Sequence, residues 1–374
     1  MKRVLIIGDG NSVFVLNHAK NIVLSDKSFS FDILLTNSFL RDDYRIYFNN
    51  IYYSHKKSIL TQIPAIKGAI IRLLIIISLL RFRRKYDIVH IQFLNDNIIY
   101  FNIFRKFAPK LIFSVWGSDF YRAKGINLLL KKRILKDADI ITFANEQTRD
   151  DFVKEIQTNA VLKICRFGLL PLDYLENLNS TKQQSRHILN LPENKTIITI
   201  GYNLNPNQQH LKIIEEIKKL KYKDYYNDLF LIVPVTYPAD KHNYRSELLN
   251  TLESAGLAFK TIENYLPEIE NAHLRNCSDI MIQLQTSDQL SGAMQEYLCT
   301  ENLVITGSWL PYKILLEKGA NIIMINSISE LSSVLDKTIG NLETLKKSVY
   351  KNREIIMELS SWKKNIQAWI NLYQ

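Results

Sequence analysis

The sequence predicts an α/β protein built from two doubly wound, Rossmann-like domains. Short apolar segments alternate with longer helix-like segments along the chain, and the alternation stops once, in a polar stretch over residues 170–195. The apolar segments mostly lack a two-residue alternation, which is typical of parallel strands covered by helices on both faces. A length of 374 residues also fits two domains.

The first half contains six apolar segments rich in Ile, Val, Leu and Phe that we expect to be strands. They cover residues 3–8, 31–37, 86–93, 110–117, 139–145 and 160–168. Longer helical stretches separate them, for example over residues 63–84 and 123–136. Strands that alternate with helices are expected to form a parallel sheet.

The pattern breaks at residues 170–195, which are polar and contain two prolines, so we expect the linker there. It restarts with strands expected within residues 196–206, 228–238, 278–285, 302–308 and 321–326. The tail over residues 344–374 has a helical period. Its apolar residues share one helical face, namely Trp362, Ile366, Trp369, Ile370 and Tyr373.

Composition excludes several classes of protein. A hydrophobic content of 47% with 23% charged residues fits a packed core rather than disorder. Three cysteines, Cys165, Cys277 and Cys299, are too few for a disulfide framework or a metal cluster, and they fit a reducing cytosol. The apolar stretches over residues 4–7 and 69–80 are too short for a signal peptide and a membrane span, respectively.

The net charge of +11 is concentrated in the first half. Residues 1–170 hold 27 Lys and Arg against 14 Asp and Glu, whereas the rest holds 21 against 23. This asymmetry suggests that one half meets an anionic partner, which is nucleic acid, a lipid surface or a phosphorylated substrate. The helix expected from residue 63 to 85 either rests on anionic lipid or is a buried helix with a solvated end. Its basic rim consists of Lys67, Arg72, Arg81, Arg83, Arg84 and Lys85.

The most informative motif is SDQLSGAMQEYLCTENLVITGS. Asp288 precedes a small-residue turn, Ser291-Gly292-Ala293, and Glu296 follows it, eight residues after Asp288. The backbone N–H groups at a helix start are unsatisfied donors, and the helix dipole favours anions there. Gly292 lets a phosphate come close, and Glu296 is placed to accept hydrogen bonds from a diol. The alternative is an ordinary capped helix with a solvated glutamate.

A second candidate stretch, GYNLNPNQQH, follows the first strand of the second half. Its polar candidates are Asn203, Asn205 and His210, behind a turn at Gly201. No lysine or arginine appears before Lys212. The alternative is a plain Asn-Pro turn that ends in a helix cap.

In the first half, SVWGSDFYR ends a strand, which is where ligands of doubly wound domains bind. Trp116 and Gly117 are therefore expected to line the ligand site. Asp119 either orients a hydroxyl group of a substrate or caps the following helix, and both possibilities stay open.

The stretch GDGNS lacks the third glycine of a dinucleotide fingerprint, so we interpret it as a tight turn. Gly8, Gly10 and Asn11 are expected to line the ligand site. His90 lies near the end of a strand, where a satisfied buried histidine is favoured over a catalytic one. The chain has no His-x-x-x-His or Cys-x-x-Cys pair, and no Asp-x-Asp that looks like a metal-binding site, so we expect no metal requirement.

Two α/β halves, a linker and a terminal helix resemble the GT-B glycosyltransferases, most closely those of family 4, over nearly the whole chain. The resemblance implies two domains facing a cleft and a C-terminal helix that crosses back to the N-terminal domain. It implies an acceptor- and membrane-facing domain over residues 1–170, a donor domain over residues 171–345 and the returning helix over residues 346–374.

The resemblance is sharpest at the family's Glu-x7-Glu motif, whose two positions Asp288 and Glu296 occupy; the first acid is shortened by one methylene. It implies that Glu296 binds the ribose of a nucleotide sugar, that the turn amides meet the diphosphate and that Asp288 lies near the transferred sugar. The loop before His210 also resembles the N-acetyl-fucosaminyltransferases of enterobacterial common antigen synthesis. The implied donor-binding set is Gly201, Asn203, His210, Gln289, Ser291, Gly292, Ala293 and Glu296.

The implied function is transfer of a hexose from a nucleotide-diphosphate sugar to a lipid-linked saccharide during bacterial O-antigen (lipopolysaccharide) or capsule-type synthesis. The implied enzyme is cytoplasmic and peripheral on the anionic inner face of the plasma membrane, with no cofactor besides its donor substrate and no nucleic-acid partner. Asp288 and Asp119 are the catalytic candidates. A retaining reaction mainly needs a stabilised leaving group, whereas an inverting one needs a base, for which Asp119 is the candidate.

Three alternatives remain. A UDP-sugar 2-epimerase shares this architecture, but no clear set of acid and base residues around the donor sugar is evident. A nucleic-acid-binding protein is suggested by charge alone. The incomplete glycine fingerprint disfavours an NAD-linked oxidoreductase.

Overall fold

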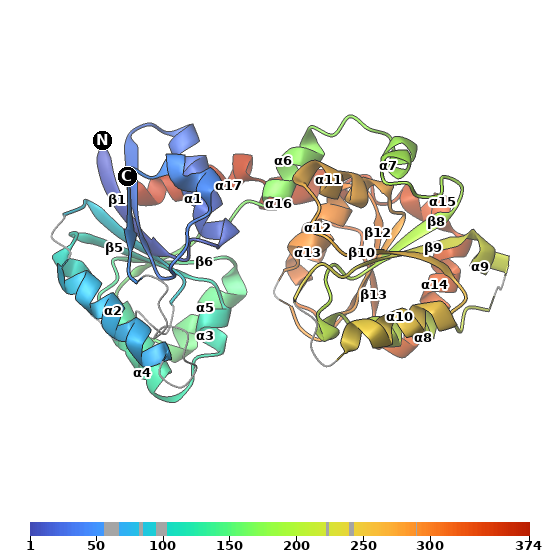
Figure 1. The fold of residues 1–374 in the computed structure, drawn as a ribbon, viewed down its shortest axis with the longest axis horizontal. Coiled ribbons are helices and arrows are strands. Elements are labelled where there is room, and N and C mark those ends of the chain that lie inside the picture. Colours follow the sequence, from blue (N-terminus) through green and yellow to red (C-terminus); the bar gives the residue numbers. More distant parts are fainter. Residues whose placement is uncertain (56–66, 82–84, 95–102, 222–223, 239–242, 289) are drawn as a thin grey trace. The chain divides into compact units, whose positions relative to one another are not determined.

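The computed structural model describes the chain except for residues 56–66, 82–84, 95–102, 222–223, 239–242 and 289. The described residues form two compact units (Figure 1). The first unit comprises Met1–Gly168 and Trp362–Gln374, and the second comprises Leu169–Ser361. Each unit has its own sheet, so we describe them separately.

The first unit contains a seven-stranded parallel sheet in the order β3-β2-β1-β4-β5-β6-β7. Its strands are β1 (Lys2–Gly8), β2 (Phe29–Leu35), β3 (Asn50–Tyr53), β4 (Ile88–Gln92), β5 (Lys110–Val115), β6 (Ile140–Phe143) and β7 (Val161–Ile164). Its helices are α1 (Val13–Ser25), α2 (Lys67–Arg81), α3 (Ser118–Tyr121), α4 (Gly125–Leu135), α5 (Glu146–Glu155) and α17 (Trp362–Tyr373). Helices cover both faces of this sheet, with α1 and α17 on one side and α2 and α4 on the other (Figure 1).

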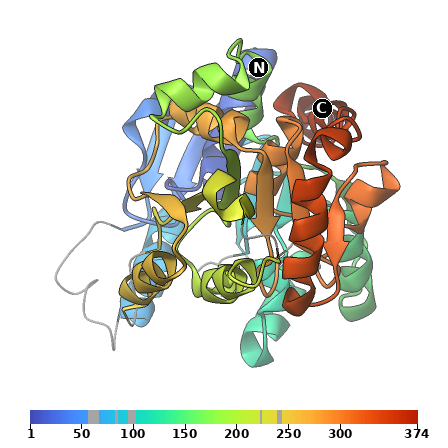
Figure 2. The same ribbon diagram turned by 90° about the vertical axis from the view of Figure 1, so that its right-hand side faces the viewer.

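The second unit contains a six-stranded parallel sheet in the order β10-β9-β8-β11-β12-β13. Its strands are β8 (Thr196–Ile200), β9 (Leu229–Pro234), β10 (Ala258–Ile262), β11 (Ile280–Gln283), β12 (Leu303–Gly307) and β13 (Ile323–Ile325). Its helices are α6 (Leu170–Glu176), α7 (Lys182–Ile188), α8 (His210–Ile217), α9 (Asp224–Asp228), α10 (Tyr244–Ser254), α11 (Glu268–Cys277), α12 (Gly292–Cys299), α13 (Lys313–Glu317), α14 (Leu331–Gly340), α15 (Leu342–Lys346) and α16 (Asn352–Ser360). In the view of Figure 2, α7 lies above the strands of this sheet and α8 below them.

Alternate residues of the central strands enter different cores, which explains the unbroken apolar segments. Val4 and Ile6 pack with residues of α1 and α17, whereas Leu5 and Ile7 pack with residues of α2. Each strand is therefore buried on both faces, as parallel strands between helices must be. The prediction of two doubly wound α/β domains is confirmed.

Residues 170–195, where we expected the linker, contain two helices and belong to the second unit. They contain α6, with Leu172 and Leu175 in the core, and α7, which begins with a capping box of Thr181 and Gln184. A proline near a helix start and a threonine cap are compatible with helices, and the few apolar residues suffice to anchor them. The boundary between the units falls between Gly168 and Leu169.

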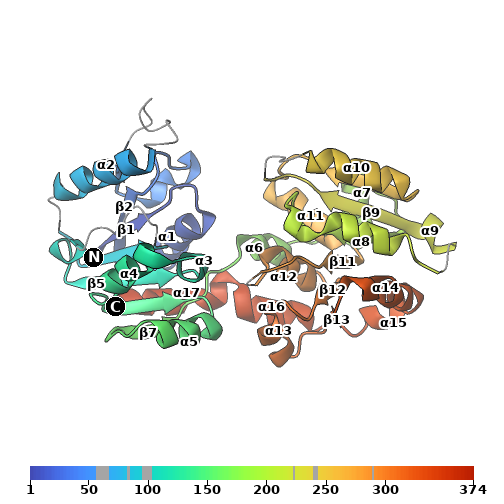
Figure 3. The same cartoon turned by 90° about the horizontal axis from the view of Figure 1, so that it is seen from below.

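The tail expected as one helix over residues 346–374 is divided. Helix α16 packs in the second unit against α12, and α17 belongs to the first unit (Figure 3). Within the first unit, Trp369 Nε1 donates a hydrogen bond to the Arg166 carbonyl at 2.8 Å. Tyr373 is fully buried, and its hydroxyl lies 2.6 Å from His90 Nδ1. The predicted return of the C-terminal helix is therefore observed.

Helix α2 uses its apolar residues mainly for the core. Ile71, Ile75 and Leu79, spaced four apart, are buried against the sheet, while Leu73 and Leu80 are exposed. Arg83 and Arg84 lie outside the described residues. Among the helices that the structure describes, none has the length and apolar character to cross a membrane.

Candidate functional site

The second sheet reverses its strand order between β8 and β11, and ligands of doubly wound folds bind at such a point, beyond the carboxyl ends of the strands. Gly201 follows β8 with a φ of +60° and donates its N–H to the Ile282 carbonyl on β11 at 3.0 Å. A side chain is disfavoured at this backbone conformation. Through its hydrogen bond to Ile282, Gly201 connects the end of β8 to the end of β11.

Two buried side chains face the bare Cα of Gly201. A Cβ at this position would lie 2.9 Å from Gln208 Oε1 and 3.0 Å from His210 Nε2. The other ring nitrogen of His210 is 3.1 Å from the Tyr244 hydroxyl. Burial lowers the pKa of His210 to about 4, so its imidazole is neutral at pH 7.

Three glutamines, which we call the glutamine cluster, gather at the same strand ends: Gln208, Gln283 and Gln285. All three are buried, and Gln208 Nε2 donates a hydrogen bond to Gln285 Oε1 at 3.2 Å. Several of their polar atoms have no hydrogen-bond partner among the described residues. These are Gln208 Oε1, both amide atoms of Gln283 and Gln285 Nε2, and His210 Nε2 shares this property. Such a concentration of unsatisfied buried groups is unusual away from ligand sites.

Asp288 lies beside two tyrosine hydroxyls. Tyr312 donates to Asp288 Oδ2 at 2.5 Å. Burial, followed by the charge of Asp288, raises the pKa of Tyr202 to about 12 and raises that of Tyr312 as well. Both hydroxyls therefore stay protonated at neutral pH. The amides of Gln283 and Gln285 lie next to the Tyr312 hydroxyl, which connects Asp288 to the glutamine cluster.

The predicted small-residue turn begins α12. Ser291 is its N-cap, and Ser291 Oγ accepts a hydrogen bond from Met294 N at 3.2 Å. Gly292 and Ala293 occupy the first turn and are half-buried. Asn203 is buried near Gly201, where its side chain accepts a hydrogen bond from Asn205 N. Gln289 lies outside the described residues.

Glu296 is a buried ion-pair partner rather than the solvated glutamate of the alternative interpretation. Its Oε2 lies 2.8 Å from Arg275 Nε on α11. Arg275 also donates to the Tyr297 hydroxyl at 3.1 Å and stacks over that ring. Glu296 Oε1 points toward the helix start, 4.0 Å from the position of a Cβ on Gly292. Arg275 thus orients the carboxylate, a role that no local motif revealed.

In the first unit, Asp119 joins the ends of two strands. Its carboxylate accepts hydrogen bonds from Leu94 N and Trp116 N, both at 2.9 Å, and burial raises its pKa. The residue before α3 is Gly117, with a φ of 98°, so Asp119 is not the N-cap of that helix. These contacts support a positioning role for Asp119.

The GDGNS stretch forms the expected tight turn after β1. Gly10 N donates to Asn37 Oδ1 at 3.1 Å, and Asn11 N donates to Asp9 Oδ1 at 2.8 Å. A Cβ on Gly10 would collide with the Phe39 carbonyl at 2.1 Å, whereas one on Gly8 would press against Val15.

His90 is a satisfied buried residue. Its Nδ1 lies 2.6 Å from the Tyr373 hydroxyl, and its Nε2 lies 2.7 Å from Ser114 Oγ. Burial lowers the pKa of His90 to about 3. Both ring nitrogens are thus engaged within the core, which favours a structural role over catalysis.

Among the described residues, no group of three His, Cys, Asp or Glu side chains is placed to hold a metal ion. Independence of metal stays a prediction.

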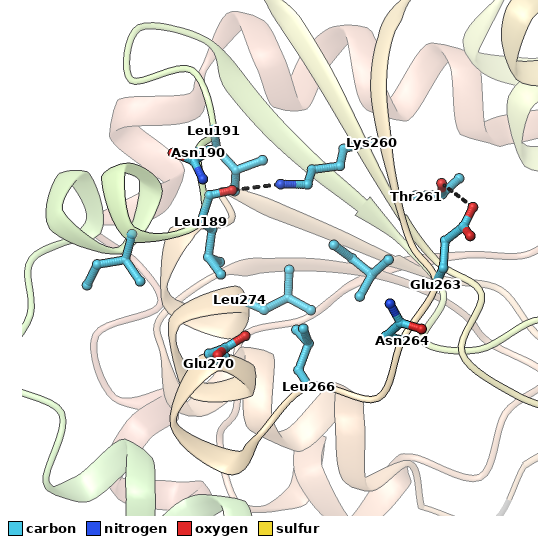
Figure 4. Close-up of a pocket in the computed structure, with 12 residues that line it drawn as sticks. Leu189, Asn190, Leu191, Lys260, Thr261, Glu263, Asn264, Leu266, Glu270 and Leu274 are labelled. Carbon is cyan, nitrogen blue, oxygen red and sulfur yellow. Dashed lines mark hydrogen bonds between the residues drawn. The ribbon is translucent and has the colours of Figure 1, made fainter.

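A separate cavity of about 370 Å³ lies beside β10 (Figure 4). Leucines at the end of α7 and on α11 form much of its wall, and Lys260 crosses it to donate to the Leu189 carbonyl at 2.8 Å. It shares no residue with the predicted donor-binding set.

The architecture of both units is that of the GT-B glycosyltransferases. Sucrose-phosphate synthase from Thermosynechococcus elongatus superimposes with a TM-score of 0.77 at 11% identity, over 100% of this chain and 98% of that chain. Anabaena HepE in complex with UDP and glucose gives 0.71 at 13% identity, over 99% of both chains. A glycosyltransferase from Rickettsia africae gives 0.68 at 15% identity, over 100% of this chain and 97% of that chain.

The sequence itself matches a family profile in the first unit. Residues 3–145 match the family described as Glycosyl transferase 4-like. No curated protein matches the chain in sequence. The match over residues 3–145 and the GT-B fold of both units confirm the predicted resemblance to family 4-like GT-B glycosyltransferases, and both indicate a transferase enzyme.

Proposed function

We propose that the second unit binds a nucleoside diphosphate sugar at the carboxyl ends of β8 and β11, and that the enzyme transfers its sugar to a lipid-linked saccharide. The observation that carries this proposal is that Gly201 and His210 follow β8, and that Asp288 and the start of α12 follow β11, where the strand order reverses. UDP is a candidate nucleotide, because structures of HepE were solved with UDP and with UDP-glucose.

Each part of the site has a chemical task in this proposal. The N–H groups at the start of α12 donate hydrogen bonds to the diphosphate, whose negative charge the helix dipole favours. Glu296, oriented by Arg275, accepts hydrogen bonds from the ribose diol. Asp288 lies near the transferred sugar. Charge that develops on the leaving diphosphate is stabilised by donors that are already in place, which is the main requirement of a retaining reaction.

Asp119 has a narrower role in the proposal. An inverting reaction requires a base, and the pKa of Asp119 is raised by burial, as a base that accepts a proton needs. Both of its carboxylate oxygens already accept backbone N–H groups, however, so we assign it first to positioning Trp116 and Leu94.

The acceptor assignment rests on the first unit. Its excess of basic residues and the exposed Leu73 and Leu80 of α2 support contact with an anionic lipid surface. A saccharide carried on a lipid is then presented to the enzyme at the inner face of a bacterial membrane. In this proposal the reaction belongs to the synthesis of a surface polysaccharide of O-antigen or capsule type.

Calorimetry with UDP, dTDP and GDP, followed by product analysis with the matching sugar donors, tests the proposal. We expect micromolar binding of one diphosphate, and sugar transfer only when a lipid-linked saccharide extract is added. Turnover of the nucleotide sugar without an acceptor would instead indicate the epimerase. Absence of binding to all three diphosphates would contradict the proposed donor class.

A further inference from the structure

We propose that the glutamine cluster (Gln208, Gln283 and Gln285) binds the hydroxyl groups of the transferred sugar and thereby determines which sugar the enzyme accepts. This inference rests on the proposed function and adds to it the residues that select the donor's sugar. Sequence reasoning left these three residues without a role.

The glutamine cluster offers both hydrogen-bond donors and hydrogen-bond acceptors. A primary amide always presents a carbonyl acceptor and an NH₂ donor, whichever way it is turned. Gln283 is fully buried. Its amide lies near the Tyr312 hydroxyl, but neither amide atom reaches a described group with the distance and angle of a hydrogen bond. A ligand that satisfies Gln283 must therefore both donate and accept hydrogen bonds at neighbouring positions.

The diphosphate and the sugar of a nucleotide sugar differ in the hydrogen bonds that they can form. The oxygens of a diphosphate only accept hydrogen bonds at neutral pH, so they leave the amide carbonyls of Gln208 and Gln283 unsatisfied. A hydroxyl group both donates and accepts. A sugar ring carries several hydroxyls at adjacent carbons, and these match the mixed donors and acceptors of the cluster.

The glutamine cluster also lies close to Asp288, the acid proposed to be near the transferred sugar. Gln208 Oε1 faces Gly201, Gln208 Nε2 bonds to Gln285, and the amides of Gln283 and Gln285 lie beside the Tyr312 hydroxyl. Tyr312 in turn donates to Asp288, the acid placed near the transferred sugar. The cluster thus extends from the turn after β8 to Asp288, at the reversal of strand order. A site that pairs buried polar groups with substrate hydroxyls strongly rejects analogues that lack them.

Substitution of Gln283 by methionine tests the proposal, because methionine keeps the length and volume while removing both hydrogen-bonding atoms. Calorimetry would compare UDP, dTDP and GDP with their glucose conjugates on the wild type and on Gln283→Met. We expect the variant to bind the free diphosphate within twofold of the wild type, and to bind the glucose conjugate at least tenfold more weakly.

Gln295→Met is the matched control. Gln295 is also buried, but its amide is satisfied within the protein, by Ser360 Oγ and the Ser291 carbonyl. We expect this control to lower thermal stability and to preserve the ratio of conjugate to diphosphate affinity. Thermal unfolding of both variants separates a loss of folding from a loss of recognition.

Three results would overturn the inference. Equal weakening of diphosphate and conjugate by Gln283→Met would mean that the cluster serves the nucleotide or the fold. Unchanged affinities would mean that ordered water satisfies the amides. A wild type that binds nucleotide sugars of one diphosphate equally tightly, whatever the hydroxyl arrangement of the sugar, would also refute sugar selection by the cluster. A wild type that binds no nucleotide would instead count against the proposed function itself.

Discussion

Glu296 is both an ion-pair partner in the core and the proposed ligand of the donor ribose. Its spacing from Asp288 and the small-residue turn between them were predictable, because a helix start imposes a local pattern on the sequence. Arg275, which holds the carboxylate, was not predictable, because it lies on α11 and meets Glu296 only through packing of the helices. The glutamine cluster was similarly hidden, since Gln208 and Gln285 are far apart in the sequence.

Substitution of Glu296 should separate these two roles. Glu296→Ala leaves the buried Arg275 without its partner, so we expect a loss of about 3–5 kcal/mol in the free energy of unfolding. Glu296→Gln keeps an acceptor for Arg275, so it should lose less stability while still weakening nucleoside diphosphate binding by about 1–3 kcal/mol. Urea unfolding measures the loss of stability, and calorimetry measures the loss of nucleotide binding.

Glu317→Gln, an exposed change on α13, serves as the control. Wild-type nucleotide affinity of Glu296→Gln would refute the ribose assignment.

At the scale of elements, most strands were predictable and two were not. Strands β3 and β10 were missed because each contains a single Ile, Val or Leu residue, whereas the other two edge strands, β7 and β13, contain more and were predicted. An edge strand packs less completely, so its sequence needs fewer apolar residues; β10 reads AFKTI and is only partly buried. The two helices within residues 170–195 were missed for a related reason, since Leu172 and Leu175 are their only buried apolar residues. Helix α17 was predictable because its aromatic face is too large to leave in water.

The attachment of α17 should depend on the Tyr373 hydroxyl. It meets His90 Nδ1 at 2.6 Å and His18 Nε2 at 3.3 Å in a fully buried position. Tyr373→Phe leaves these imidazole nitrogens without their partner, so we expect a loss of about 1–3 kcal/mol in the free energy of unfolding. Tyr350→Phe, at an exposed position, should cost little. Equal stability of the two variants would show that the Tyr373 hydroxyl does not help to hold α17.

The same histidines should make the protein sensitive to acid. Burial lowers the pKa of His18, to which the charge of His90 adds, and burial lowers the pKa of His90 from 6.5 to about 3. Above pH 6.5 these residues are neutral in the folded and unfolded chains. As the pH falls, the unfolded chain takes up protons first, so the free energy of unfolding should decrease between pH 6.5 and about 3.

Urea unfolding across this pH range measures the effect. His90→Gln should flatten the pH dependence, whereas the exposed His187→Gln should leave it unchanged. The same slope in His90→Gln and the wild type would show that His90 does not carry the effect.

At the scale of the whole molecule, the basic residues are unevenly distributed, and their partner is a prediction from charge. Replacing Arg81, Arg83, Arg84 and Lys85 with Gln should weaken binding to anionic vesicles, and wild-type binding should fall as salt is raised. Vesicle sedimentation measures both. A Gln variant of four basic residues in the second unit, Lys212, Lys218, Lys313 and Lys318, provides the control. Equal sedimentation of the wild type and the first variant would assign the charge excess to another partner.

The central claim is that the second unit holds the nucleotide sugar at the ends of β8 and β11. Hydrogen-exchange mass spectrometry, with and without a saturating nucleoside diphosphate, tests this most directly, because it reports which backbone amides the ligand protects. We predict increased protection over residues 200–210 and 283–297, where Gly201, the glutamine cluster and the start of α12 lie. Protection confined to residues 1–168, with these two segments unchanged, would contradict the assignment of the donor site.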